Sequence, residues 1–137
     1  MESDLRKVNK VAEKICENLK SYGLGDKELY FIRLIIAELL NNAVIHGNQN
    51  DPKKNVSISC KVENENLIVE VSDEGDLFNL KIPEKPDLFL DYGRGLYLVS
   101  KLVDFIDVIK DNRKKVVIHK KLNKKNNKLE DNPLTCC

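Results

Sequence analysis

The chain has 137 residues, of which 42% are hydrophobic and 33% charged, so it is long enough for one domain with its own core and is neither disordered nor fibrous. Lysine and arginine (23) nearly balance aspartate and glutamate (22), for a net charge of +1, whereas proteins that grip nucleic acid through many phosphates usually carry a basic excess. The longest apolar runs, such as residues 34–37, are far shorter than the ~20 residues of a membrane span. We therefore expect a cytoplasmic protein that binds no nucleic acid directly and no membrane.

Two helices are predicted at the start of the chain. Residues 3–19 carry apolar side chains at helical spacing, and a break with two glycines leads to a second helix over 27–46. The second helix has the broadest apolar face, and Gly47 is expected to end it. Cys16 and Cys60 fall among apolar positions, and the chain has no CxxC pair, so we expect both to be reduced core residues.

Two segments with alternating apolar residues follow, at 56–62 and 67–71. A turn at Asn64–Asn66 separates them, which predicts an antiparallel hairpin. From Asp73 to Tyr92 the periodicity is lost, and long loops of this kind are often lids or binding loops.

A third helix is predicted from Gly93 to about Val103, followed by two strands at 105–109 and 115–120. Beyond Leu122 the chain is rich in Lys and Asn, so residues 1–122 are expected to form the domain and 123–137 a flexible tail. Each strand has one apolar face for the helices to cover. The predicted fold is therefore α+β, a two-layer sandwich of a mainly antiparallel sheet covered by helices.

The second helix carries a polar stripe beside its apolar face. Glu38, Asn42 and His46 are spaced by four residues and so lie along one line of the helix. Polar groups beside a core are costly unless they are paired or used. A carboxylate and an amide one turn apart could hold a hydrated Mg²⁺, which prefers oxygen ligands and keeps waters and phosphate oxygens. The spacing alone fits a solvated helix edge at least as well.

Two further motifs stand at the ends of the long loop. Asp73 and Gly75 follow the second strand, where a carboxylate could accept a hydrogen bond from a ligand amine and a glycine lets a flat ring approach the backbone. Gly93-Arg94-Gly95-Leu96 open the third helix, where backbone N–H groups and the helix dipole suit a phosphate. Taken singly, these motifs also fit an ordinary turn and a loop-to-helix joint.

The order of the motifs is more informative than any one of them. Glu-x-x-x-Asn on a helix, Asp-x-Gly after a strand and Gly-x-Gly at a helix start resemble the GHKL ATP-binding superfamily, which contains histidine kinases, gyrase-type ATPases and bacterial anti-sigma factor serine kinases. The resemblance covers roughly residues 3–122 and implies the GHKL (Bergerat-type) fold. Segments 38–47, 73–78 and 93–99 look most like the anti-sigma kinases of the RsbW type.

The resemblance implies a role for each residue of the helix stripe. Asn42 would bind the Mg²⁺ that bridges the ATP phosphates. Glu38 would be the catalytic base that polarises the incoming hydroxyl group. His46 would lie close to the phosphates.

The resemblance also implies the nucleotide contacts at the loop. Asp73 would accept a hydrogen bond from the adenine amino group, with Gly75 lining the purine. Gly93 and Gly95 would form the phosphate-side hinge of a lid over about residues 76–92. The implied nucleotide-binding residues at this hinge are Gly93, Arg94, Gly95 and Leu96.

The function that the resemblance implies is that of an ATP-dependent protein-serine kinase that is also an anti-sigma factor. Its partners would be a sigma factor and a STAS-domain anti-anti-sigma factor, and a homodimer is compatible with the family. One alternative is a histidine-kinase-like ATPase domain acting in trans, although His46 and His119 are the chain's histidines and neither falls on a separate phosphoacceptor helix. The other is an ATP-dependent binding regulator without phosphotransfer, for which a base at Glu38 would be unnecessary.

Overall fold

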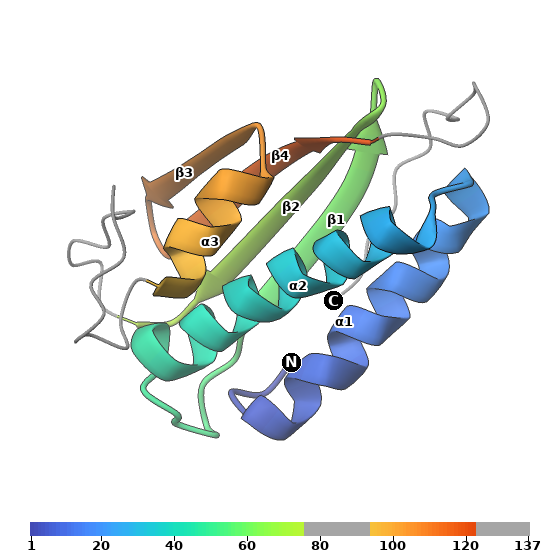
Figure 1. Cartoon of the computed structure of the whole chain (residues 1–137). Coiled ribbons are helices and arrows are strands. Elements are labelled where there is room, and N and C mark those ends of the chain that lie inside the picture. The colour runs from blue at the N-terminus through green and yellow to red at the C-terminus, as the bar shows by residue number, and fades with distance from the viewer. Residues whose placement is uncertain (76–93, 123–137) are drawn as a thin grey trace.

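Our computed structural model describes residues 1–75 and 94–122. Within these residues, three α-helices lie on one face of a four-stranded antiparallel sheet whose strand order is β1-β2-β4-β3 (Figure 1). This is the α+β two-layer sandwich that the sequence predicts. The predicted lid over 76–92 and the predicted tail over 123–137 lie outside the described residues.

Helix α1 (Leu5–Leu19) starts two residues later than predicted because Asp4 is its N-cap. The Asp4 carboxylate accepts a hydrogen bond from the Arg6 backbone N–H at 2.9 Å, which satisfies one of the free donors at the helix start. A 3₁₀ turn, η1 (Lys20–Tyr22), ends at Gly23, whose φ of 74° is left-handed. The buried side chains of α1 are Val8, Ala12, Ile15, Cys16 and Leu19.

The second predicted helix is α-helical only in its first part. Helix α2 spans Asp26–Asn42, and the next five residues, Ala43–Gly47, form the wider π-helical turn η2. The Asn48 backbone N–H donates to the Ala43 carbonyl at 2.8 Å, five residues back, as a π turn requires. Such turns occur often at functional sites, and this one carries His46.

Helix α2 with η2 is the central element of the core. By length and composition alone, the 22 residues Asp26–Gly47 are long and apolar enough to cross a membrane. In this fold one face of it is buried among α1, α3 and the sheet, while Tyr30 on the other side is exposed. Burial of each large apolar side chain contributes about 1.5–3 kcal/mol, so the core accounts for the apolar composition. The buried residues of α2 are Ile32, Ile35, Ile36, Leu39, Leu40 and Asn42.

Strands β1 and β2 confirm the predicted alternation, whereas in β4 the consecutive residues Val116, Val117 and Ile118 are all buried. Strands β1 (Ser57–Glu63) and β2 (Asn66–Asp73) form the predicted hairpin, and Asn64 and Glu65 both have positive φ in its turn, as tight hairpin turns favour. Helix α3 (Arg94–Leu102) follows. Strands β3 (Phe105–Lys110) and β4 (Lys114–Lys121) complete the sheet. Cys60 of β1 and Cys16 of α1 are both buried, and neither forms a disulfide with another described residue.

Polar residues lie at one end of the helix-facing side of β2 and at both ends of that side of β4. The helix-facing side of β2 runs from Leu67 to Val71 and ends in Asp73, which is 2% exposed. The same side of β4 starts with Lys114 and ends with Lys120, with apolar residues between them. These end positions are where the sandwich departs from a purely apolar core.

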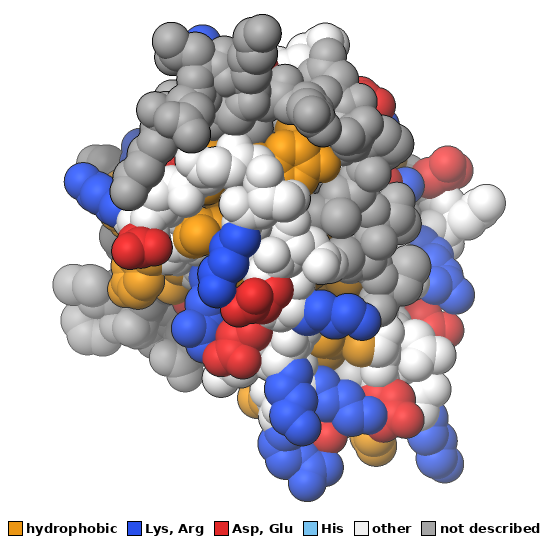
Figure 2. All heavy atoms as spheres, turned by 90° about the vertical axis from the view of Figure 1, so that its right-hand side faces the viewer, with side chains coloured by type: hydrophobic (Ala, Val, Ile, Leu, Met, Phe, Trp, Pro, Cys, Tyr) orange, Lys and Arg blue, Asp and Glu red, His pale blue; other side chains and the backbone are white. Residues whose placement is uncertain are grey.

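The surface at the end of the molecule where α1 ends and α2 begins is strongly charged. Figure 2 shows basic side chains lying next to acidic ones across this face. Two of the ion pairs on these helices are Arg33–Glu13, at 2.9 Å, and Lys20–Glu17, at 2.8 Å. Exposed pairs of this kind contribute only about 0–1 kcal/mol each, so they affect solubility more than stability.

Candidate functional site

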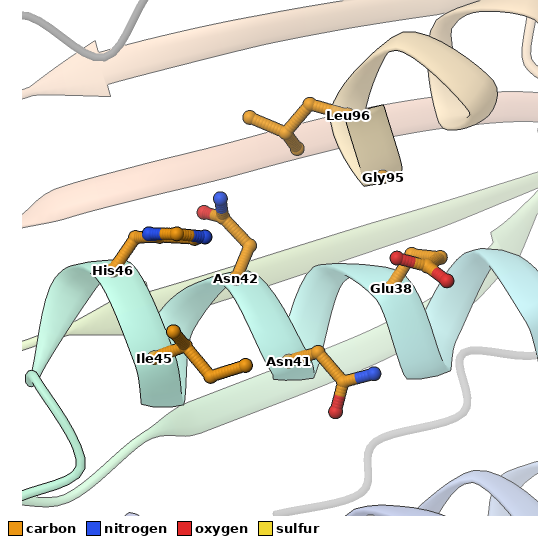
Figure 3. A pocket seen from close by; sticks show the side chains of 7 residues that line it. All are labelled: Glu38, Asn41, Asn42, Ile45, His46, Gly95 and Leu96. Carbon is orange, nitrogen blue, oxygen red and sulfur yellow. The ribbon is translucent and has the colours of Figure 1, made fainter. Parts of the chain in front are cut away.

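A cavity of about 160 Å³ lies between the C-terminal half of α2, η2 and the start of α3. Its volume is smaller than the roughly 300–1,000 Å³ of typical small-molecule pockets, so by itself it would hold part of a nucleotide. Figure 3 shows the side chains of α2 and η2 on one side of it and the first turn of α3 on the other. The lining residues are Glu38, Asn41, Asn42, Ile45, His46, Gly95 and Leu96.

Glu38 lies directly against the N-terminal turn of α3. A Cβ atom at position 95 would overlap with the Glu38 Oε2 atom, so a glycine at position 95 makes room for this carboxylate. Burial raises the pKa of the Glu38 carboxyl above its ordinary value of 4.5, because a charged group loses hydration there. A carboxylate with a raised pKa is a better proton acceptor when it is ionised.

Asn42 and His46 complete the polar wall of the cavity. The Asn42 side chain is 7% exposed, and both it and His46 point toward the side where Leu96 lies (Figure 3). Asn42 thereby supplies an amide oxygen, an acceptable Mg²⁺ ligand, next to a carboxylate one turn away. The stripe expected from the four-residue spacing thus lines a cavity, in which Asn42 is buried while Glu38 and His46 are half-buried.

Asp73 lies beside this cavity and does not line it. Its Oδ1 atom accepts a hydrogen bond from the Gly75 backbone N–H at 2.9 Å, and its Oδ2 atom is 3.1 Å from the Lys114 ammonium nitrogen. A Cβ at position 47 would overlap with the Asp73 carboxylate. Since Gly47 follows His46 directly, the last turn of η2 connects Asp73 to the cavity wall.

Gly75 packs against the backbone of the same turn. A Cβ at position 75 would overlap with the Gly47 carbonyl oxygen, so Gly75 is required by the close approach of two backbone segments, whereas Gly47 makes room for the Asp73 carboxylate. This contact brings the Asp-x-Gly motif of β2 to the end of the α2–η2 helix. Asn42 and Asp73 are 31 residues apart in the chain, yet the two motifs share one corner of the fold.

Asn48 holds this corner together. It is fully buried, and its side-chain amide donates to Ser3 Oγ at 2.5 Å and to the Asn55 carbonyl at 3.0 Å. Its Oδ1 atom accepts from the Glu74 backbone N–H at 2.7 Å. The bond to Glu74 fixes the loop after η2 against the end of β2, next to Asp73 and Gly75, and the other two tie that loop to Ser3 and Asn55.

The structure therefore gathers most of the predicted site at one end of the sandwich. Glu38, Asn42, His46, Gly95 and Leu96 surround the cavity, and Asp73 and Gly75 lie next to it through Gly47. Arg94 is the first residue of α3, and Gly93 lies outside the described residues.

Sequence reasoning missed the roles of three residues in this corner. It assigned no role to Asn48 or Lys114, and it expected Gly47 only to end the helix, without its contacts to Asp73 and Gly75. Lys114 had a readable signal, because the alternation Lys114, Val116, Ile118 already points it to the core face. Asn48 had none, since its partners come from the N-terminal segment and two loops.

Comparison with known proteins gives a consistent result. Residues 1–121 match the family described as the histidine kinase-like ATPase domain. The anti-sigma F factor of Oceanobacillus iheyensis is 29% identical over 89 residues, which are 60% of this chain and 60% of that protein. That of Geobacillus stearothermophilus is 32% identical over 101 residues, 69% of this chain and 68% of that protein. The chain thus spans about three fifths of the length of the first relative.

Solved structures agree with the fold. The histidine kinase domain of the Erythrobacter litoralis EL346 blue-light activated histidine kinase superposes with a TM-score of 0.51 and 25% identity, covering 70% of this chain and 45% of that one. A second structure, of the Erythrobacter litoralis EL346 blue-light activated histidine kinase, gives a TM-score of 0.53, covering 72% of this chain and 32% of that one. The chain therefore belongs to the family of histidine kinase-like ATPase domains, which implies ATP binding, and it is related to the anti-sigma F factors.

Proposed function

We propose that this chain is an anti-sigma factor of the cytoplasm that uses ATP as a protein-serine kinase. It would sequester a sigma factor and phosphorylate a serine of a STAS-domain anti-anti-sigma factor. The observation that carries the kinase part is that Glu38 and Asn42, on one helix, line a single cavity against the first turn of α3. Similarity to anti-sigma F factors supports the sigma-factor partner.

Asn42 would hold Mg²⁺ through its side-chain oxygen. When bound, Mg²⁺ neutralises charge on the transferring phosphates. The donor set fits this ion, because Mg²⁺ is commonly held by one or two protein oxygens together with waters and phosphates. Within residues 1–75 and 94–122, no group of three His, Cys, Asp or Glu residues gathers as a protein cage for a metal, so Asn42 would act together with the nucleotide.

Glu38 would act as the base. Its carboxylate would take the proton of the serine hydroxyl as the serine oxygen bonds to the γ-phosphorus and the bond to the bridging oxygen breaks, releasing ADP. The backbone N–H groups at the start of α3 would face the phosphates. Gly95 keeps room for the carboxylate next to these groups.

Asp73 would recognise the adenine ring of the nucleotide. Its carboxylate would accept a hydrogen bond from the amino group of adenine, while the bare backbone at Gly75 would lie along the ring. Asp73 is buried and held by the Gly75 N–H, and this geometry fixes its position before the nucleotide arrives.

Transfer of labelled phosphate tests the proposal. The chain, Mg²⁺ and γ-labelled ATP should label a serine of a STAS-domain partner from the same genome. Glu38→Gln should keep ATP binding and slow the transfer at least ~100-fold. Glu28→Gln, on the same helix at its other end, should transfer at the wild-type rate. Transfer at full rate by Glu38→Gln would show that Glu38 is not the base.

A second candidate follows from the solved structures, which are histidine kinase domains. In this chain His46 is part of the cavity wall, and His119 lies on β4 with its ring 5.0 Å from that of Phe105. A histidine kinase-like activity would thus act on a partner's histidine. The same assay separates the candidates, because phosphohistidine is lost in acid and phosphoserine is retained. ATP binding with no transfer to either residue would favour a binding regulator.

A further inference from the structure

Lys114 is a buried cation that no part of the proposed mechanism uses. It begins β4 on the helix-facing side and is 4% exposed. In the sheet it stands directly opposite Asp73, and the two side chains form an ion pair at 3.1 Å. Their side chains are 5% and 3% exposed, so the pair is shielded from water on nearly every side.

A buried ion pair is a poor way to stabilise a core. Removing two charges from water costs several kcal/mol per ion, and apolar residues of similar size at the same positions often give equal or higher stability. The neighbouring positions on both strands, Val71 and Val116, are apolar and buried. The pair therefore needs an explanation other than stability.

The ammonium group of Lys114 has hydrogen-bonding capacity beyond this contact. It carries three N–H donors, and among residues 1–75 and 94–122 the recorded partner of its nitrogen is Asp73. Lys120, at the other end of the same strand face, instead bonds to the Leu102 carbonyl at 3.1 Å and lies 3.7 Å from Glu28. Lys120 thus joins two elements of the fold, whereas Lys114 stands beside one carboxylate at the site.

We infer that Lys114 is a specificity-determining residue that reads the purine together with Asp73, donating a hydrogen bond to a ring nitrogen beside the amino group. The inference rests on the proposed function, in which Asp73 accepts from that amino group. In adenine the amino group lies between two acceptor nitrogens, N1 and N7. An acceptor carboxylate next to a donor ammonium is the complement of such a donor–acceptor edge.

Nucleotide analogues test this on the wild-type chain. ATP, 1-deaza-ATP and 7-deaza-ATP, each with Mg²⁺, are titrated by calorimetry. Loss of one charge-assisted hydrogen bond weakens binding about 10- to 100-fold, so one of the two analogues should bind that much more weakly than ATP. The 1-deaza analogue reports contact at N1 and the 7-deaza analogue contact at N7. Equal binding of all three nucleotides would overturn the inference.

Variants show whether Lys114 is the donor. Lys114→Met should weaken ATP binding by about the same factor and should bind ATP and the sensitive analogue equally well. Lys120→Met, a matched change on the same strand face, should keep the wild-type preference. If Lys114→Met still discriminates between ATP and the analogue, Lys114 is not the donor.

Two further measurements keep the outcomes distinct. Lys114→Met leaves Asp73 buried without its partner, so the double variant Asp73→Asn/Lys114→Met serves where the single variant does not fold, and it too should lose the discrimination. Inosine triphosphate lacks the amino group, and binding as tight as that of ATP would contradict the role of Asp73 in the proposed function. Failure of the folded chain to bind ATP would overturn the proposed function and this inference together.

Discussion

The two ends of β4 place a lysine in the same setting with different consequences. At one end Lys120 donates to the last turn of α3 and lies near Glu28 of α2, so it ties two helices to the sheet. At the other end Lys114 pairs with Asp73. These two residues already lie opposite each other in the hydrogen-bonded strands β4 and β2. The first lysine adds a connection to the fold. The second adds a charge to a place where the fold is already connected.

The difference extends to the surroundings of each pair. The Asp73 end contains Gly47 and Gly75, whose backbones approach each other closely, and the cavity with Glu38. The Glu28 end contains one buried acceptor atom without a hydrogen bond among the described residues, Glu28 Oε1. The Glu28 end thus has an acceptor without a hydrogen bond in the described part of the chain, whereas at the site end the Asp73 carboxylate has a partner for each oxygen and two glycines make room for close contacts.

Asp73→Asn is the change with the largest expected effect. It leaves the Lys114 ammonium buried beside a neutral amide, which should lower the free energy of unfolding by about 3 kcal/mol. It should also weaken ATP binding by about 1.5–3 kcal/mol, the range for a hydrogen bond to a charged group. Urea denaturation and calorimetry measure the two effects. Glu28→Gln, the matched change at the other end, should cost less than ~1 kcal/mol, and equal costs for both would refute the contrast.

Gly75→Ala should have the next largest effect on stability. The new Cβ meets the backbone carbonyl of Gly47, which cannot rotate away as a side chain could, so overpacking should cost about 1–3 kcal/mol. Gly95→Ala is the control, since its Cβ meets only the end of the flexible Glu38 side chain. It should leave the unfolding free energy nearly unchanged and slow phosphate transfer. Thermal melts of the two variants would contradict this if Gly95→Ala were the less stable.

Lys120→Met removes the hydrogen bond to the Leu102 carbonyl. Such a bond contributes about 1 kcal/mol, and the variant should lose about that much in the free energy of unfolding by urea titration. ATP affinity should stay at the wild-type value because the residue lies at the far end of β4. A drop in ATP affinity with an unchanged fold would show that the two ends are coupled.

Glu38→Gln should have a small, pH-dependent effect on stability. Burial raises the pKa of Glu38 in the folded chain, so folding favours its protonated form, and the wild type loses stability as the pH rises through the folded pKa. At pH 7 the glutamine variant should therefore melt at a slightly higher temperature than the wild type. Below pH 4.5 the difference should vanish. A variant that is less stable at pH 7 would contradict the burial of this carboxylate.

The fold was largely predictable because its patterns are local. Period-two alternation predicts β1 and β2, and helical spacing predicts α1 and the stripe of Glu38, Asn42 and His46. The π turn of η2 was not predictable from that spacing, because a single turn is too short to reveal the change from i→i+4 to i→i+5 hydrogen bonds. Its formation depends on contacts of residues 48–50 with the preceding turn.

The site was predictable in its parts and not in its assembly. The Asp73–Lys114 pair depends on the register between β2 and β4, and these strands are separated by a long loop and a helix. The contact of Gly47 with Asp73 and Gly75 likewise joins segments about 26 residues apart. No local pattern encodes such neighbours, so periodicity alone could identify faces and not partners.

Hydrogen exchange with and without Mg²⁺ and ATP tests the central claim, that the nucleotide binds at the Asp73 end of the sandwich. Exchange should slow in peptides covering residues 38–47, 73–75 and 94–96. Peptides around Glu28 and Lys120 should be unchanged. Protection confined to the Glu28 end, or no protection in a folded chain at saturating ATP, would contradict the account.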